Sequence, residues 1–211
     1  MIILTAGHTG PDTGAQCAAT HFDEGAENIW LRNRIAEILT NDYGLVVLMD
    51  DDTASLKLLV KELSRDTARR VLSVNRPTNN QSNERTDARQ DTARRVPTSN
   101  DFVIDLHFNA HSNPNARGTE TIISDDANDT EIFLASKFAH ITAQTLEIPL
   151  RSIKSESQTP HKRLAMLHIK PNSIILEICF CTSPEDVEAY RKHRHKLADK
   201  LAQTIAKLIK P

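Results

Sequence analysis

Short runs of apolar residues alternate along this chain with longer segments in which apolar residues recur at helical spacing. The apolar runs, which predict strands, lie at residues 2–6, 45–49, 101–107, 118–123 and 174–180. The segments with helical spacing lie at residues 24–39, 129–146 and 183–209. A strand–helix–strand order is typical of parallel crossover connections, so the pattern predicts an α/β fold.

Two of the predicted helices carry a local start signal. Asp23 directly precedes the first helix and is a suitable N-cap, because its carboxylate can accept a hydrogen bond from a free backbone N–H of the first turn. Ser183 and Pro184 open the last helix, with serine as N-cap and proline at the first helical position. These signals predict where both helices begin.

Residues 53–100 are the least regular part of the chain. The hexapeptide Asp-Thr-Ala-Arg-Arg-Val occurs at residues 66–71 and again at 91–96, on either side of a polar stretch at 75–84. Two copies are too few for a solenoid, so we interpret the region as two charged helices joined by a polar loop. Its arginine-rich face is either solvated or in contact with an anionic substrate.

Two shorter polar segments are expected to lie outside regular elements. Residues 151–163 are polar and irregular, which predicts a loop beside the functional site. Residues 50–52 are three consecutive aspartates, and we interpret them as a solvated turn, since consecutive side chains point in different directions.

The composition excludes several function classes. The length of 211 residues and the hydrophobic fraction of 39% suit a single domain. The formal net charge is −2, and no strongly basic face is required, so nucleic acid is not an expected partner. No apolar run approaches the length of a membrane span, and the first residues lack the features of a signal peptide. We therefore expect synthesis in the cytoplasm without a leader, and not a membrane protein.

The chain has three cysteines, Cys17, Cys179 and Cys181. An odd number is not typical of a disulfide scaffold, and the spacing is not that of a zinc ribbon. We interpret all three as small buried hydrophobic residues of a chain made in a reducing compartment.

Four residues are candidates for chemistry because of their places in the predicted elements. His8 and His107 each follow an apolar strand, and strand ends are the usual ligand positions in an open α/β sheet. Glu24 starts a helix, where it either points back toward the preceding loop or merely complements the helix dipole. Glu177 lies within an apolar strand, where it either turns out to solvent or is desolvated for a function.

Together these residues form a plausible zinc site. His8, Glu24 and His107 would supply two imidazoles and one carboxylate, which suit Zn²⁺ and leave a fourth position for water. Glu177 could face that water as a general base, because zinc lowers the pKa of bound water toward ~7. No HExxH motif is present, so the spacing alone is not diagnostic.

Five segments add a more specific signal when they are taken together in chain order. They are Thr5-Ala-Gly-His8, Glu24 with Asn28, His107-Phe-Asn-Ala110, Gly118-Thr-Glu120 and Ile175-Leu-Glu-Ile-Cys-Phe180. In this order the segments resemble the zinc-dependent N-acetylmuramoyl-L-alanine amidases, the family of bacterial cell-separation amidases and many phage endolysins. The resemblance runs from the first strand to the last helix and so covers nearly the whole chain.

The resemblance implies a role for each matched position. His8, Glu24 and His107 would bind one Zn²⁺ ion, and Glu177 would be the catalytic glutamate. Asn109 would orient the metal loop or touch substrate. Glu27 is an alternative ligand to Glu24, although Asn28 fixes the register in favour of Glu24.

The resemblance also implies the architecture. We expect a single α/β domain over residues 1–211, with a twisted, mainly parallel β-sheet flanked by helices on both faces. Residues 53–100 would be a charged helical and loop region within that domain, and no wall-binding module is expected.

The implied function is hydrolysis of the amide between N-acetylmuramic acid and L-alanine in peptidoglycan, by a cell-wall-lytic endolysin or autolysin. The protein would act on the wall after release from the cytoplasm, with a pore-forming holin as partner only if it is a phage endolysin. Two other functions remain open from the residues: a muropeptide-binding domain without catalysis, and a zinc peptidase that cleaves within the stem peptide.

Overall fold

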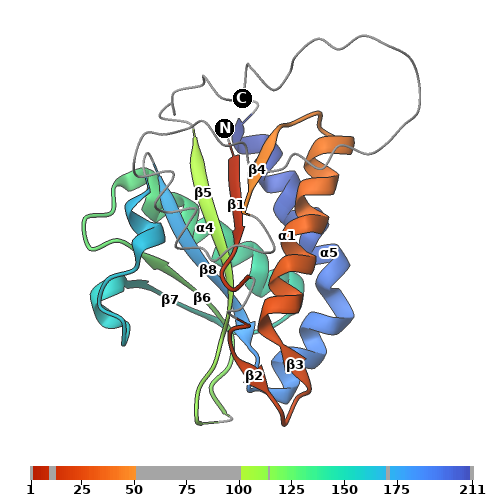
Figure 1. Ribbon diagram of the computed structural model, residues 1–211, viewed down its shortest axis with the longest axis vertical. Coiled ribbons are helices and arrows are strands. Elements are labelled where there is room, and N and C mark those ends of the chain that lie inside the picture. Colours follow the sequence, from red (N-terminus) through yellow and green to blue (C-terminus); the bar gives the residue numbers. More distant parts are fainter. Residues whose placement is uncertain (1, 10–12, 51–100, 114, 170–171, 210–211) are drawn as a thin grey trace.

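The strands and helices follow the predicted order closely. A computed structural model describes residues 2–9, 13–50, 101–113, 115–169 and 172–209 (Figure 1). The strands are β1 (Ile2–Ala6), β2 (Gln16–Cys17), β3 (Phe22–Asp23), β4 (Val47–Met49), β5 (Phe102–Asn109), β6 (Thr119–Ile123), β7 (Leu150–Ser155) and β8 (Ser173–Phe180). The helices are α1 (Glu24–Asn41), α4 (Asp129–Leu146) and α5 (Pro184–Ile209), with 3-10 turns at Glu156–Gln158 and Ala165–His168. The interpretation of residues 53–100, with its repeated hexapeptide, falls outside the described residues.

Six strands form one mixed sheet in the order β4-β1-β5-β8-β6-β7. β4, β1, β5 and β8 run parallel to one another, β6 is antiparallel to β8, and β7 is parallel to β6. A second, two-stranded sheet pairs β2 with β3 in antiparallel fashion. The predicted α/β class and the mainly parallel sheet are therefore confirmed.

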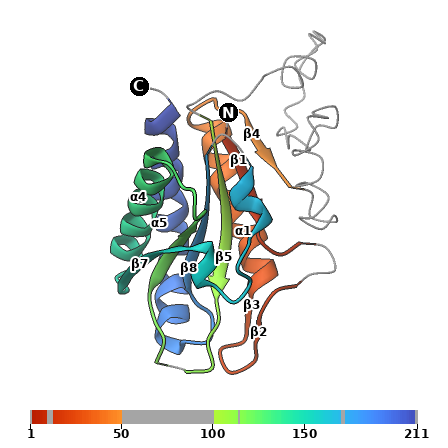
Figure 2. The same cartoon turned by 90° about the vertical axis from the view of Figure 1, so that its left-hand side faces the viewer.

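The three described helices share one face of the main sheet. Alternate residues of the central strands, such as Leu4, Ile104 and Leu176, pack with apolar residues of α1, α4 and α5 in one large core. The opposite face carries two small apolar clusters that include Met166 and Leu167 of the second 3-10 turn, and Figure 2 shows this segment on the side away from α4 and α5. Within the described residues, helices thus flank the sheet on one face rather than both. None of the described helices combines the length and apolarity that crossing a membrane requires.

Both predicted helix starts are confirmed by hydrogen bonds. The Asp23 carboxylate accepts from the backbone N–H of Ala26, and this N-cap fixes Glu24 as the first residue of α1. The Ser183 hydroxyl accepts from the backbone N–H of Asp186 at the start of α5.

The prediction of an irregular loop over residues 151–163 was wrong for its first part. Arg151 to Ser155 belong to β7, which is the edge strand of the sheet and pairs only with β6 among the described strands. All six residues of β7 are at least partly exposed, so the strand lacks the apolar alternation that would reveal it in the sequence.

The interpretation of the cysteines was wrong for two of the three. Cys17 and Cys181 are joined by a disulfide across 164 residues of sequence, with their Cα atoms 6.1 Å apart. The fold brings β2 beside the end of β8, a proximity that cysteine number and spacing do not encode. Cys179 is free and buried, as expected.

The interpretation of residues 50–52 as a solvated turn was wrong for Asp50, whereas Asp51 and Asp52 fall outside the described residues. Asp50 directly follows β4 and is buried. Its Oδ1 atom lies 2.6 Å from Nη1 of Arg32 and accepts a hydrogen bond from the backbone N–H of Ala6. Burial raises the pKa of the Asp50 carboxyl to about 6, although the charge of Arg32 opposes this rise. The pair therefore anchors α1 to the end of β4.

Replacing Arg32 should be costly because it leaves the Asp50 carboxylate buried without its main partner. We expect Arg32→Met to lower the free energy of unfolding at pH 7 by about 3 kcal/mol, measured by urea denaturation. The cost should shrink at pH 5, because a carboxyl with a raised folded pKa is destabilising only where it is ionised. Arg34→Met is the matched control on the same helix, since its exposed pair with Glu37 is worth less than about 1 kcal/mol. Equal costs for the two variants would contradict the prediction.

Candidate metal centre

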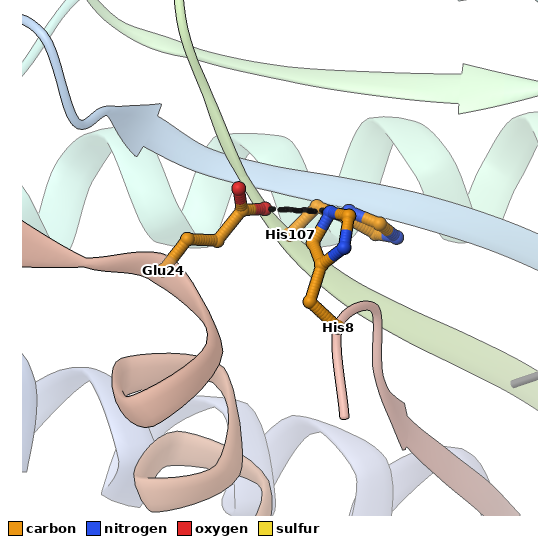
Figure 3. Close-up of side chains that lie close together, drawn as sticks. All are labelled: His8, Glu24 and His107. Atoms are coloured by element: carbon orange, nitrogen blue, oxygen red, sulfur yellow. Dashed lines mark ion pairs between the residues drawn. The ribbon is translucent and has the colours of Figure 1, made fainter. Parts of the chain in front are cut away.

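Three side chains that are distant in the sequence meet at the carboxyl ends of the central strands. His8 follows β1, Glu24 opens α1, and His107 lies near the end of β5. One ligand atom from each of them lies within 4.8 Å of the other two. Figure 3 shows the Glu24 carboxylate and the two imidazoles converging from these three elements. The structure therefore brings together the three residues predicted as metal ligands.

Glu24 is held in place by its own carboxylate. Its Oε2 atom accepts from the backbone N–H of Ala15 at 2.8 Å, and its Oε1 atom accepts from the backbone N–H of Phe108 at 3.0 Å. The same Oε1 atom lies 3.4 Å from Nε2 of His8 and 3.4 Å from Nδ1 of His107. Since Glu24 is 3% exposed, it is more than a solvated complement to the helix dipole.

The alternative ligand, Glu27, lies elsewhere. Its carboxylate accepts from the Tyr190 hydroxyl at 3.1 Å and pairs with the guanidinium of Arg194 at 2.9 Å. The described residues thus favour Glu24 over Glu27 as the carboxylate of the cluster.

The surroundings of Glu24 keep it ionised. Burial by itself would raise the pKa of the Glu24 carboxyl. The hydrogen bond and charge of His107, the charge of His8 and the hydrogen bond from Ala15 outweigh burial and hold the pKa below its usual value. A carboxylate that stays charged in a buried position is suited to bind a cation.

His107 is oriented by a residue that the sequence reasoning missed. Its Nε2 atom lies 3.1 Å from the carboxylate of Asp105, which in turn accepts from the Thr5 hydroxyl at 2.6 Å. Burial would lower the pKa of the His107 imidazole, but the charge and hydrogen bond of Asp105, with help from Glu24 and Glu177, raise it well above its usual value. A proton on Nε2 that bonds Asp105 leaves Nδ1 free to face the cluster, as in carboxylate–histidine–metal arrangements.

Two glycines provide the space in which the cluster fits. A Cβ atom on Gly7 would lie 2.0 Å from the His107 ring, so that position requires glycine. A Cβ atom on Gly14, whose φ is +64°, would lie 2.6 Å from the His8 ring and 2.7 Å from a Glu24 carboxylate oxygen. The glycines of the loop after β1 therefore allow the backbone to approach both imidazoles closely.

Glu177 lies beside His107 on the neighbouring strand. The two residues are directly paired between β5 and β8, so their side chains share one face of the sheet. The Oε2 atom of Glu177 is buried and has no hydrogen-bond partner within the described part of the chain. Burial raises the pKa of the Glu177 carboxyl to about 7; the charge of His107 opposes the rise, and the charges of Glu24, Glu120 and Asp105 add to it.

Asn109 contacts Glu120, and its predicted role in orienting the metal loop or touching substrate stays a prediction. Its side-chain amide donates to Oε1 of Glu120 at 2.7 Å, and Glu120 pairs directly with Glu177 between β6 and β8. Glu120 is only 2% exposed. Glu120 belongs to one of the five segments of the family resemblance, but the sequence predicted no function for it. Its neighbours come from other strands, so its contacts could not be read from the segment alone.

The donor set fits a metal ion. Two imidazoles and one ionised carboxylate suit zinc, and three protein ligands leave a coordination position open. The unpartnered Oε2 atom of Glu177 gives a polar group on the same face, where a water molecule bound at that position could donate to it. The His8–Glu24–His107 cluster could therefore bind a metal.

Comparison with known proteins identifies the same architecture elsewhere. A family model described as N-acetylmuramoyl-L-alanine amidase matches residues 2–210. No curated protein sequence matches the chain.

Several solved structures share the fold. An N-acetylmuramoyl-L-alanine amidase from Clostridium difficile 630 has a TM-score of 0.69 and 20% identity, over 98% of this chain and 94% of that one. The amidase AmiC2 of Nostoc punctiforme has a TM-score of 0.69 and 18% identity, over 100% and 97%. The catalytic domain of the CD27L endolysin targeting Clostridia difficile has a TM-score of 0.60 and 19% identity, over 99% and 95%. At these identities the likeness concerns the fold.

Removing the carboxylate behind His107 should weaken metal binding. We expect Asp105→Ala to lower zinc affinity by roughly 10–100-fold, because it removes the acceptor that orients the imidazole. Asp105→Asn keeps an acceptor without the charge and should lose less. Competition with a chelating dye measures the affinity, and Asp126→Ala, at an exposed position, is the control. Unchanged zinc affinity in Asp105→Ala would show that the contact with His107 has no part in metal binding.

Proposed function

The chain belongs to the N-acetylmuramoyl-L-alanine amidase family. We propose that it hydrolyses the amide bond that gives the family its name, with Glu177 as general base beside a zinc ion held by His8, Glu24 and His107. The family acts on peptidoglycan, so the substrate is the amide between the lactyl group of N-acetylmuramic acid and the L-alanine of the stem peptide.

One metal ion is proposed, at the cluster already described. Zinc, when bound there, would acidify a water molecule and polarise the scissile carbonyl, which are its general contributions to hydrolysis. His8 and His107 would supply neutral nitrogen ligands. Glu24 would supply the charge, and its two backbone hydrogen bonds would keep its carboxylate fixed while the reaction proceeds.

The observation that carries the proposal is the state of Glu177. A buried carboxylate oxygen without a partner among the described residues is costly unless it has a function. With a pKa raised to about 7, the group can both accept and return a proton near neutral pH. Glu177 would accept the proton of the attacking water and then deliver it to the leaving amine of L-alanine. No covalent nucleophile is needed.

The proposed cleavage can be tested by the amino termini released from purified peptidoglycan. We expect new L-alanine termini, loss of their release when a chelator removes the metal, and recovery when zinc is restored. Amino termini on other residues would instead identify a peptidase acting within the stem peptide. Binding to peptidoglycan without release of any termini, in a zinc-loaded sample, would identify a muropeptide-binding domain.

The role of Glu177 can be separated from metal binding. We expect Glu177→Gln to retain zinc and to lower kcat by roughly 10²–10⁴-fold, because the amide cannot accept the proton of water. Zinc content by atomic absorption and kcat from the rate of terminus release give the two readouts. Glu188→Gln, at an exposed position of α5, is the control and should match the parent protein. Substantial activity of Glu177→Gln with full zinc content would refute the general-base role.

A further inference from the structure

A row of polar side chains continues from the metal cluster toward the open edge of the sheet. His107 on β5 pairs with Glu177 on β8, and Glu177 pairs with Glu120 on β6. Directly paired residues place their side chains on the same face, so all three face the same side as the cluster. The row ends at the edge strand β7, which contributes two cations.

Arg151 and Lys154 of β7 converge on the buried carboxylate of Glu120. Arg151 donates through Nε to one oxygen at 2.7 Å, and Lys154 donates through Nζ to the other at 2.8 Å. Asn109, from the strand that carries His107, donates to the same oxygen as Lys154. Both oxygens of Glu120 thus accept hydrogen bonds, from three donors in all, and these bonds hold both cations in place.

The guanidinium of Arg151 is held at two further points. Its Nη1 atom donates to the backbone carbonyl of Arg117 at 3.2 Å, and its Cζ atom lies 5.0 Å from the centre of the Phe180 ring. A guanidinium fixed in this way loses little entropy when it binds a ligand.

The group formed by Arg151, Lys154 and Glu120 carries more positive than negative charge. Two cations face one carboxylate, and both remain about one-third exposed, at 36% for Arg151 and 32% for Lys154. An arginine has five N–H donors and a lysine ammonium has three, so both keep donors beyond those used on Glu120. A pre-positioned, partly exposed pair of this kind is suited to bind a carboxylate.

The distance from the reacting groups limits which part of the substrate could reach this pair. Arg151 lies two strands from Glu177, which corresponds to roughly 10 Å at the usual strand spacing. An extended peptide rises roughly 3.3–3.6 Å per residue. A carboxylate on the second or third residue of a stem peptide would therefore reach the pair when the scissile amide lies at Glu177.

We propose that Arg151 and Lys154, held by Glu120, form a subsite for a carboxylate of the peptidoglycan stem peptide. The proposal rests on the function proposed above and adds to it a preference among peptides. The second residue of the stem is a D-glutamate joined through its side chain, and its α-carboxyl group is free in some walls and amidated in others. The subsite would favour the free form, and a third residue with its own carboxylate is the other source of the same chemistry.

The test uses free stem peptides, which contain no scissile bond and can be added to the zinc-loaded native protein. Isothermal titration compares L-alanyl-γ-D-glutamyl-L-lysine, blocked as its C-terminal amide, with the same blocked peptide carrying an α-carboxamide on D-glutamate, so that the two peptides differ in one carboxylate only. We expect the acid to bind roughly tenfold more tightly, as for a partly exposed hydrogen bond to a charged group. A third peptide, the amide form with diaminopimelate in place of lysine, should regain affinity only if the third residue supplies the carboxylate.

Variants then locate the preference. The double variant Arg151→Gln, Lys154→Gln should bind acid and amide peptides equally, and Arg151→Lys should keep part of the preference. Lys137→Gln, on α4 at the opposite face of the sheet, removes one positive charge elsewhere and should leave the ratio unchanged.

Three results would overturn the subsite: no measurable binding of the acidic peptide, equal affinities in the native protein, or an unchanged ratio in the double variant. A purely structural clamp on β7 would lower stability without altering that ratio. Release of L-alanine termini from peptidoglycan, measured on the same preparation, reports the proposed function separately, so that its failure is distinguished from failure of the subsite.

Discussion

The carboxylate of Glu24 connects three parts of the chain that the rest of the site depends on. One oxygen accepts a backbone hydrogen bond from the loop before β2 and the other accepts one from β5, and Glu24 itself is the first residue of α1. Removing these hydrogen bonds would leave a buried charge, a buried N–H group and a part-buried N–H group without these partners, which costs far more than losing an exposed contact. The position of α1 against the sheet and the geometry of the cluster with His8 and His107 are therefore set by the same group.

Three glutamates at this end of the sheet differ only in their neighbours. Glu24 faces imidazoles and backbone N–H groups, and these hold its pKa low. Glu120 is surrounded by an amide, a guanidinium and an ammonium, which satisfy both of its oxygens. Glu177 lies between them, and its pKa rises to about 7 because burial and the nearby carboxylates outweigh the charge of His107. In the proposed function, Glu24 would bind the metal cation and Glu177 would exchange a proton, whereas Glu120 holds the two cations of β7.

Local signals in the sequence predicted five of the described strands, the helix starts and the three residues of the cluster. Apolar runs, helix caps and glycine–histidine segments can be recognised from a few neighbouring residues. The strand–helix–strand pattern indicated parallel crossovers and the family resemblance added a mainly parallel sheet, but the order of the strands came only from the structure. The contacts that were missed are between distant segments: Asp105 with Thr5 of the neighbouring strand, and Glu120 with β7. The edge strand itself was missed because its side chains are exposed, so burial imposes no alternating pattern on it.

The disulfide between Cys17 and Cys181 turns most of the chain into a covalent ring. Three of the four candidate catalytic and metal-binding residues, Glu24, His107 and Glu177, lie on that ring, and His8 lies on the short tail before it. A protease that cuts one peptide bond anywhere between the two cysteines would open the ring without releasing a fragment. The pieces that carry the cluster would stay in one molecule, so a nicked enzyme in an oxidising environment keeps all of its site residues tethered together.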